Sequence, residues 1–279
     1  MGAPGSGAGR QHALGVPYAL PQDSEEINRL DFQHYLLRHA FRGNFAAPIR
    51  KPQTILDVGC GTGRWAREMA QAFPDARVAG VDINTPPADA QAHTGARQGR
   101  FAFTPGNMLE GLPFSDASFD FTHMRLMFLA IPADRWEYVA RELARVTRPG
   151  GWVESVETTG LHNGGPHVEM MMTWISQMSA RRQVDLMNGS RVADFMRGAG
   201  LRNVAASVVN VPTGVWGDRL GSMVATDFVG VCKGYGGLLV GAGITTQEQF
   251  DQTLEGMNSD FASRRSRCYT PFYVVIGQR

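Results

Sequence analysis

The chain has 279 residues, 43% of them hydrophobic and 19% charged, a composition too apolar for a disordered segment and sufficient for one large core. Its 27 lysine and arginine residues against 26 aspartate and glutamate residues give a formal charge of +1, which offers no broad attraction for nucleic acid. Cys60, Cys232 and Cys268 form no C-x-x-C pair, which argues against a disulfide framework or zinc knuckle and fits a reducing cytoplasm. We find no run of about 18 apolar residues and no signal-peptide pattern, and therefore expect no membrane segment.

The N-terminal fifty residues divide into a leader and a helical unit. Residues 1–16 are rich in glycine and alanine, which predicts a flexible leader. The spacing of apolar residues from Ile27 to Phe41 predicts a helix that Ser24 can cap. We assign residues 17–50 to this helical unit.

From residue 54 onward, strands and helices alternate. Apolar runs predict strands at 54–58, 77–83, 101–104, 119–123, 152–157, 204–211 and 271–277. Helices are predicted at 64–73, from Asp134 to about 147, at 166–183 and at 191–198. Asp134 and Glu137 have capping-box spacing, and residues 148–151 stop that helix. We therefore expect a doubly wound α/β domain at 51–279, with a mainly parallel seven-stranded sheet and a Gly-interrupted helical insert at about 215–262 before the last strand.

The turn after the first of these strands carries glycine at every second position. A dinucleotide fingerprint would need a third glycine where Arg64 stands, which weakens a pyrophosphate interpretation. Asp57, just before the turn, would repel phosphate but favour an ammonium group. Asp82 follows Gly63 by 19 residues, where a carboxylate can accept both ribose hydroxyls. The pattern indicates a nucleoside bound at the strand tips.

A family resemblance rests on four segments that follow one another in the chain: LDVGCGTG, GVDIN, PGNMLEGLPFSDASFDF and RVTRPGGWVESVE. Over about residues 54–157 the chain resembles class I S-adenosylmethionine-dependent methyltransferases. The segments YALPQDSEEINRLDFQH and FDFTHMR are similar to a subgroup related to quinone-biosynthesis enzymes and to fungal secondary-metabolism regulators. The resemblance implies S-adenosylmethionine as the cofactor.

The resemblance also implies which residues hold the cofactor. The methionine part would lie along the turn formed by Gly59, Cys60, Gly61 and Gly63, with Asp57 at its amino group. Asp82 would bind the ribose, and Ile83 would pack on adenine. Asn107, where the family often has Asp, would accept a hydrogen bond from the adenine amino group or is an ordinary turn residue, and Met108 would donate its backbone amide to the ring.

Related enzymes fold their N-terminal segment over the cofactor, so residues 17–50 are expected to be a lid. Its candidate contacts are Tyr18, Arg29, Gln33 and His34, although a packed or solvated helix face is the competing interpretation for them.

Methyl transfer needs mainly positioning, and a base is optional. His123 and Glu157 end the fourth and fifth strands at the edge where open sheets bind ligands. Each is a candidate catalytic residue, with Tyr18 beside them, and Glu157 could orient His123 or accept a substrate donor. The alternatives are a histidine held within the sheet edge and a surface carboxylate. Arg125 would bind the methionine carboxylate or an anionic group on the acceptor.

The acceptor is the least determined part of the prediction. Residues 170–178 are rich in methionine and predict either a pocket wall or packing in a core or homo-oligomer. His162 and His167 lack nearby carboxylates, so we expect no metal. We expect a small, largely apolar aromatic or heteroaromatic metabolite, for example an indole, methylated on carbon or nitrogen in a pathway such as antibiotic biosynthesis. Open alternatives are O-methylation, a cofactor-binding regulator with little turnover, and a nicotinamide oxidoreductase; neither a nucleic-acid nor a membrane partner is expected.

Overall fold

The structure, a computed structural model, describes residues 24–84 and 100–279. The expected leader, Tyr18 and the first residues of the 17–50 unit lie outside the described residues. The described chain forms one seven-stranded sheet in the order β3-β2-β1-β4-β5-β7-β6. Its strands are β1 (Thr54–Val58), β2 (Arg77–Asp82), β3 (Arg100–Pro105), β4 (Phe119–Arg125), β5 (Thr147–Thr158), β6 (Arg202–Pro212) and β7 (Tyr269–Gln278).

The sheet is parallel except at β7, which runs antiparallel to both β5 and β6. After β1 the chain first builds outward through β2 and β3, and then returns to add β4 on the other side of β1. Ligands of open α/β sheets bind at this reversal, outside the carboxyl ends of the strands. The predicted fold class, a mainly parallel seven-stranded α/β fold, is confirmed.

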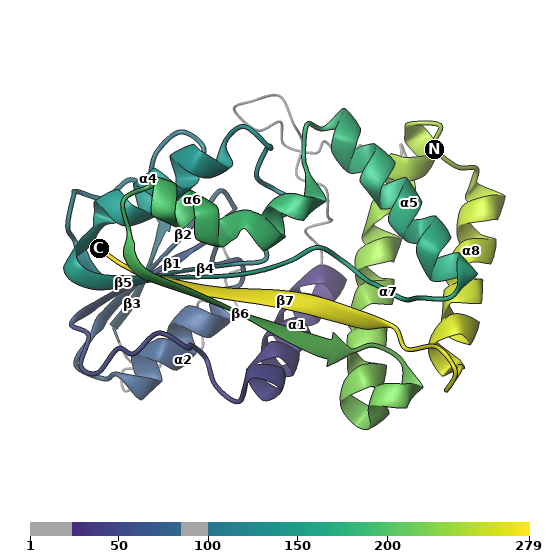
Figure 1. The fold of residues 1–279 in the computed structure, drawn as a ribbon, viewed down its shortest axis with the longest axis horizontal. Helices are drawn as coiled ribbons and strands as arrows, with labels where there is room; N and C mark the ends of the chain where they lie inside the picture. The colour runs from purple at the N-terminus through teal and green to yellow at the C-terminus, as the bar shows by residue number, and fades with distance from the viewer. Residues whose placement is uncertain (1–23, 85–99) are drawn as a thin grey trace, which may run out of the picture.

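The helices cover both faces of the sheet and build a separate layer at its end (Figure 1). They are α1 (Ser24–Phe41), α2 (Arg64–Ala72), α4 (Trp136–Val146), α5 (Pro166–Arg181), α6 (Val192–Gly198), α7 (Asp218–Gly241) and α8 (Gln247–Ala262), with 3-10 turns η1 (Leu186–Arg191) and η2 (Val215–Gly217). Figure 1 shows α4 and α6 on one face, α2 on the other, and α5, α7 and α8 gathered at one end. We call this group of three helices the cap.

Hydrophobic burial explains the two layers on the sheet. In α2, Trp65, Ala66, Met69 and Ala70 recur at helical spacing and are buried against Phe121 of β4. Burying a large apolar side chain contributes about 1.5 to 3 kcal/mol each. The cap has a hydrophobic core of its own, so it is more than a loop laid over the sheet.

Two predicted boundaries are wrong for local reasons. The capping box at Asp134 does not form, because α4 begins after Arg135 and has no side-chain cap. Strand β5 begins at Thr147 instead of residue 152, because Thr147 still pairs with Phe119 before the register shifts. The segment that was expected to stop a helix is therefore the irregular start of a strand.

The helical insert is less interrupted than its glycines suggested, since α7 runs unbroken over 24 residues. Gly236 explains one of those glycines: a Cβ there would lie 2.8 Å from Cε1 of Phe250 in α8. A small residue is thus needed where the two cap helices approach each other. Gly236 therefore serves packing, and α7 continues through it to Gly241.

One segment, Val215–Gly241, is long and apolar enough to pass a membrane-span test, with a mean hydropathy of 1.2 and one third of its window buried. Core helices pass the same test. Asp227 and Lys233 interrupt its apolar run, so the sequence shows no stretch of about 18 apolar residues here. In the structure this helix contacts α1, α5, α8 and β6.

Candidate functional site

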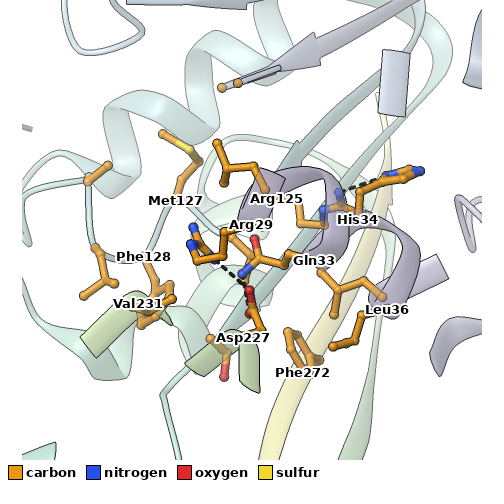
Figure 2. A pocket seen from close by; sticks show the side chains of 18 of the residues that line it. Arg29, Gln33, His34, Leu36, Arg125, Met127, Phe128, Asp227, Val231 and Phe272 are labelled. Atoms are coloured by element: carbon orange, nitrogen blue, oxygen red, sulfur yellow. Dashed lines mark hydrogen bonds and ion pairs between the residues drawn. The ribbon is translucent and has the colours of Figure 1, made fainter. Parts of the chain in front are cut away.

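A cavity of about 230 Å³ lies at the reversal point of the sheet. Its walls come from α1, the turn after β1, the segment after β4, and α7 of the cap (Figure 2). A smaller cavity of about 60 Å³ lies beside it, beyond the ends of β1 and β2. Gly59, Asp82, Ile83 and Met127 border both cavities. The two spaces are thus neighbouring compartments of one site.

The glycine turn takes a conformation that other residues rarely adopt. Gly59 has a φ of 69°, and a Cβ there would lie 2.5 Å from the sulfur of Met127. The turn is held in place because the Gly61 amide donates to Oδ2 of Asp82, at 2.8 Å. Glycine at position 59 therefore keeps the floor between the two cavities open.

Asp57 and His123 form a buried pair on adjacent strands. Their Cα atoms are partners in the β1–β4 register, and Nδ1 of His123 lies 3.0 Å from Oδ1 of Asp57. The indole of Trp65 stacks on the imidazole at 3.8 Å between ring centroids. The histidine is held within the sheet edge, which is the alternative that the sequence left open, although its side chain also borders the larger cavity. A role for His123 as a base stays a prediction.

The smaller cavity carries the residues expected near ribose and adenine. Asp82 accepts hydrogen bonds from the amides of Gly61 and Asn84, and burial raises its pKa. Ile83 is 38% exposed and faces the space that an adenine ring would need. In the part of the chain that the structure describes, the amide of Met108 donates to no acceptor.

The side chain of Asn107 forms hydrogen bonds within the turn that contains it. Its Oδ1 accepts from the Leu109 amide at 3.0 Å, and its Nδ2 donates to Glu110 at 3.1 Å. The expected hydrogen bond from adenine would therefore have to use the second lone pair of the same oxygen. Local turn chemistry accounts for Asn107 without a ligand.

The expectation that Glu157 orients His123 is wrong. Glu157 is fully buried, and its two oxygens accept from the amides of Met127 and Phe128, at 3.1 and 3.0 Å. Burial raises the pKa of Glu157 to about 8, although the two amide bonds favour the carboxylate. The side chain anchors the segment that follows β4, where Leu126 has a φ of 57°. Sequence reasoning missed this role because the partners are backbone groups.

Arg125 ends β4 and borders the larger cavity. Its Nη2 lies 3.3 Å from Nδ1 of His34, which is a buried residue of α1. On the other side, Nε2 of His34 lies 3.1 Å from Glu68 without the alignment of a hydrogen bond. Burial, assisted by Arg125, lowers the pKa of His34 to about 4, so this imidazole is neutral at pH 7.

Arg29 and Gln33 border the larger cavity and bind a carboxylate of the cap. Both donate at 2.8 Å to Asp227 of α7, one to each oxygen, as Figure 2 shows. Arg29 also holds Glu26 with two hydrogen bonds, at 2.7 and 2.6 Å. We call this set of four residues the α1–α7 clasp. These hydrogen bonds join the α1 wall to the cap, and because both residues also border the larger cavity, their contact with the cofactor stays a prediction.

One feature of the sequence points to the clasp: Asp227 is an acid within a mainly apolar helix. Burial raises the pKa of Asp227 despite the nearby cation. Such a carboxylate is stable in a cavity wall only where donors surround it. Its partners, however, lie almost two hundred residues away in the chain.

The methionine-rich stretch is mostly core. Met171, Trp174 and Met178 pack inside the cap, and Met170 is 48% exposed. Of this stretch, Met172 and Ile175 border the cavity. The apolar wall comes mainly from other segments, through Leu36, Leu37, Leu186, Val224, Phe228, Val231 and Phe272. Within residues 24–84 and 100–279, no group of three or more metal-ligating side chains gathers.

The chemistry of these groups fits a nucleoside with an amino-acid tail. The turn gives backbone space, Asp57 gives a carboxylate for an ammonium group, Asp82 gives an acceptor for ribose hydroxyls, and Met108 gives a free amide donor. Helix α2 begins directly after the turn without a side-chain cap, so its first amides are available to an anion. The residues present thus fit S-adenosylmethionine.

Residues 55–151 match a protein family described as a methyltransferase domain. Methyltransferase str2 of Strobilurus tenacellus is 34% identical over 145 residues, which are 51% of this chain and 50% of that protein. The secondary metabolism regulator laeA of Aspergillus flavus is 33% identical over 142 residues, 50% of this chain and 37% of that protein. The chain spans about half the length of the curated relatives it matches, or less.

A solved structure supports the fold. Phosphoethanolamine N-methyltransferase 2 of Haemonchus contortus, in complex with S-adenosylhomocysteine, matches with a TM-score of 0.54 and 18% identity, over 89% of this chain and 57% of that chain. At this identity the likeness supports the fold alone.

Proposed function

We propose that this chain is a class I S-adenosylmethionine-dependent methyltransferase and that it transfers a methyl group from S-adenosylmethionine to carbon or nitrogen of a small, largely apolar aromatic metabolite. The match to a methyltransferase domain and the fungal relatives support the reaction and its setting in secondary metabolism. The single observation that carries the proposal is the pair of adjoining cavities. The glycine turn and Asp82 line the larger cavity, which continues into an apolar space, and Gly59 and Asp82 also border the smaller one.

The residues of the turn would hold the cofactor. Gly59 and Gly61 leave room for its methionine part, Asp57 faces the ammonium group, and Asp82 accepts from the ribose. The cofactor supplies an electrophilic methyl group on a sulfonium. His123 keeps the Asp57 carboxylate in place through Nδ1, and the stacked Trp65 fixes the imidazole plane.

The protein's contribution to the transfer is mostly orientation and exclusion of water. Holding two reactants in line can supply about 7 to 11 kcal/mol of the barrier. The α1–α7 clasp joins the two walls that face each other across the larger cavity, which favours a closed site. Glu157 fixes the segment of Met127 and Phe128, and both of these side chains border that cavity.

The test uses purified chain, methyl-labelled S-adenosylmethionine, and fractionated small-molecule extracts. We expect labelled product from a fraction of apolar aromatic compounds, identified by mass spectrometry, and less of it with the Asp82→Ala variant at subsaturating cofactor. Calorimetry should show binding of S-adenosylhomocysteine. Binding of NAD in place of S-adenosylhomocysteine would refute the proposal.

A second candidate is a regulator that binds the cofactor with little turnover, favoured by the name of the laeA relative. The same experiment separates the two. Cofactor binding without transfer to any fraction would favour the regulator, whereas labelled product would favour the enzyme.

A further inference from the structure

The larger cavity contains a guanidinium with no anionic partner. Arg125 is half-buried where it borders the cavity. In the part of the chain that the structure describes, no carboxylate forms an ion pair with it, and its only hydrogen-bond contact is His34, at 3.3 Å from Nη2. A guanidinium carries five N–H donors, so most of its capacity is unused. Burial accordingly lowers the pKa of Arg125.

The carboxylates around Arg125 are already engaged by other groups. Asp57 is paired with His123. The other three are Glu154, bound to the amides of Ala46 and Ala47; Glu157, bound to the amides of Met127 and Phe128; and Glu68, bound to Arg38 and Asn44. A buried charge without a counter-ion is costly. Within the described ranges, the protein thus keeps a cation at the cavity wall without a carboxylate paired to it.

His34 does not neutralise the Arg125 guanidinium, and it contacts only the Nη2 nitrogen. Because this imidazole is neutral, it can accept from Nη2 without competing as a second cation. The remaining N–H groups can take a carboxylate in the two-pronged geometry that arginine favours.

The other residues of the cavity wall indicate what kind of molecule would bear the carboxylate that Arg125 binds. Leu36, Leu37 and Phe272 belong to the same cavity and offer only apolar surface. The carboxylate of the cofactor has other donors, namely the first amides of α2 beside the turn. We propose that Arg125 receives a carboxylate of the methyl acceptor, so that the acceptor class is an apolar ring or chain bearing a carboxylic acid. This inference rests on the proposed function and narrows its substrate class.

The test measures ligand binding to the protein saturated with S-adenosylhomocysteine. The probes are indole-3-acetate, phenylacetate and hexanoate, each compared with its uncharged amide. We expect at least one acid to bind the unmodified protein more tightly than its amide does. Arg125→Gln should weaken that acid by about 10- to 100-fold and leave the amide unchanged, with Arg125→Lys between them. Arg197→Gln, an exposed arginine of α6, is the matched control and should change nothing.

Affinity for S-adenosylhomocysteine and for 5′-methylthioadenosine, which lacks the carboxylate, is measured on every variant. Unchanged affinities show that the variants are folded and that Arg125 does not serve the cofactor. Weakened S-adenosylhomocysteine with unchanged 5′-methylthioadenosine would assign Arg125 to the cofactor carboxylate and overturn the inference. So would equal binding of the acids to Arg125→Gln, or binding of none of them to the unmodified protein. Failure of the unmodified protein to bind S-adenosylhomocysteine at all would instead remove the proposed function, and the inference with it.

Discussion

The α1–α7 clasp makes an asymmetric prediction about stability. Arg29 lies between two buried carboxylates, Glu26 and Asp227, with side-chain exposures of 8% and 12%. Arg29→Gln removes the cation from both. Removing one partner of a buried ion pair typically costs about 3 to 5 kcal/mol, because a buried charge is left uncompensated. We expect a loss of that size in the free energy of unfolding.

Asp227→Asn should cost much less. Arg29 keeps Glu26 through two hydrogen bonds, and the new amide oxygen can still accept from it. The substitution also removes a carboxylate whose pKa burial raises, so part of the lost attraction is offset. We expect a cost of about 1 kcal/mol, close to that of one ordinary hydrogen bond.

The assay is urea unfolding followed by circular dichroism, at pH 7 and one ionic strength. The double variant Arg29→Gln/Asp227→Asn tests the coupling, since it leaves no uncompensated charge at position 227. It should be more stable than the sum of the single costs predicts, while Arg197→Gln, an exposed control, should fall within about 0.5 kcal/mol of the unmodified protein. If Asp227→Asn costs as much as Arg29→Gln, or the double variant shows simple additivity, the charge argument is refuted.

Three further predictions concern the turn and the segment after β4. Gly59→Ala should abolish detectable S-adenosylhomocysteine binding in calorimetry, because its Cβ would lie 2.5 Å from the Met127 sulfur, whereas Gly150→Ala, with φ 80° and open space, should leave binding unchanged. Asp82→Ala removes the expected ribose acceptor and should weaken S-adenosylhomocysteine by about 1.5 to 3 kcal/mol; an unchanged dissociation constant would take Asp82 out of the site. Glu157 has a folded-state pKa raised to about 8, so the stability linked to it is fully present below about pH 4.5 and is lost as the pH rises through 8. Between pH 5 and pH 8, the free energy of unfolding should therefore fall more for the unmodified protein than for Glu157→Gln. Equal falls in the two proteins would contradict that pKa.

The positions of the strands along the chain and the glycine turn could be predicted because their signals are local. An apolar run of five residues, an acid and alternating glycines are contiguous at 54–63, and each has a steric or electrostatic reason. The start of β5 could not, since Pro149 and two glycines look like a stop signal, and only pairing with Phe119 extends the strand through them.

The hydrogen bonds and ion pairs of the site join residues that are far apart in the sequence or involve backbone groups, so local sequence patterns do not predict them. Arg29 meets Asp227 across 198 positions of the chain. Glu157 binds two backbone amides, which any residues at 127 and 128 would supply. Glu157 is a catalytic candidate from the sequence, whereas the donors of both buried glutamates of β5 show them to be anchors. Glu154 anchors the segment before β1, and Glu157 anchors the segment after β4.

These anchors explain why the site favours a particular kind of ligand. The fold satisfies nearly every acid around the cavity from within, by backbone amides at Glu154 and Glu157, and by side chains at Glu68 and Asp227. Among the described residues, the hydrogen-bond donors without an acceptor include the Met108 amide at the smaller cavity and most N–H groups of Arg125 at the larger one. A ligand that complements this wall must bring acceptors, such as ring nitrogens and carboxylate oxygens, and must bury its remaining surface on hydrocarbon. The surplus of donors, more than any single catalytic candidate, limits what can bind productively.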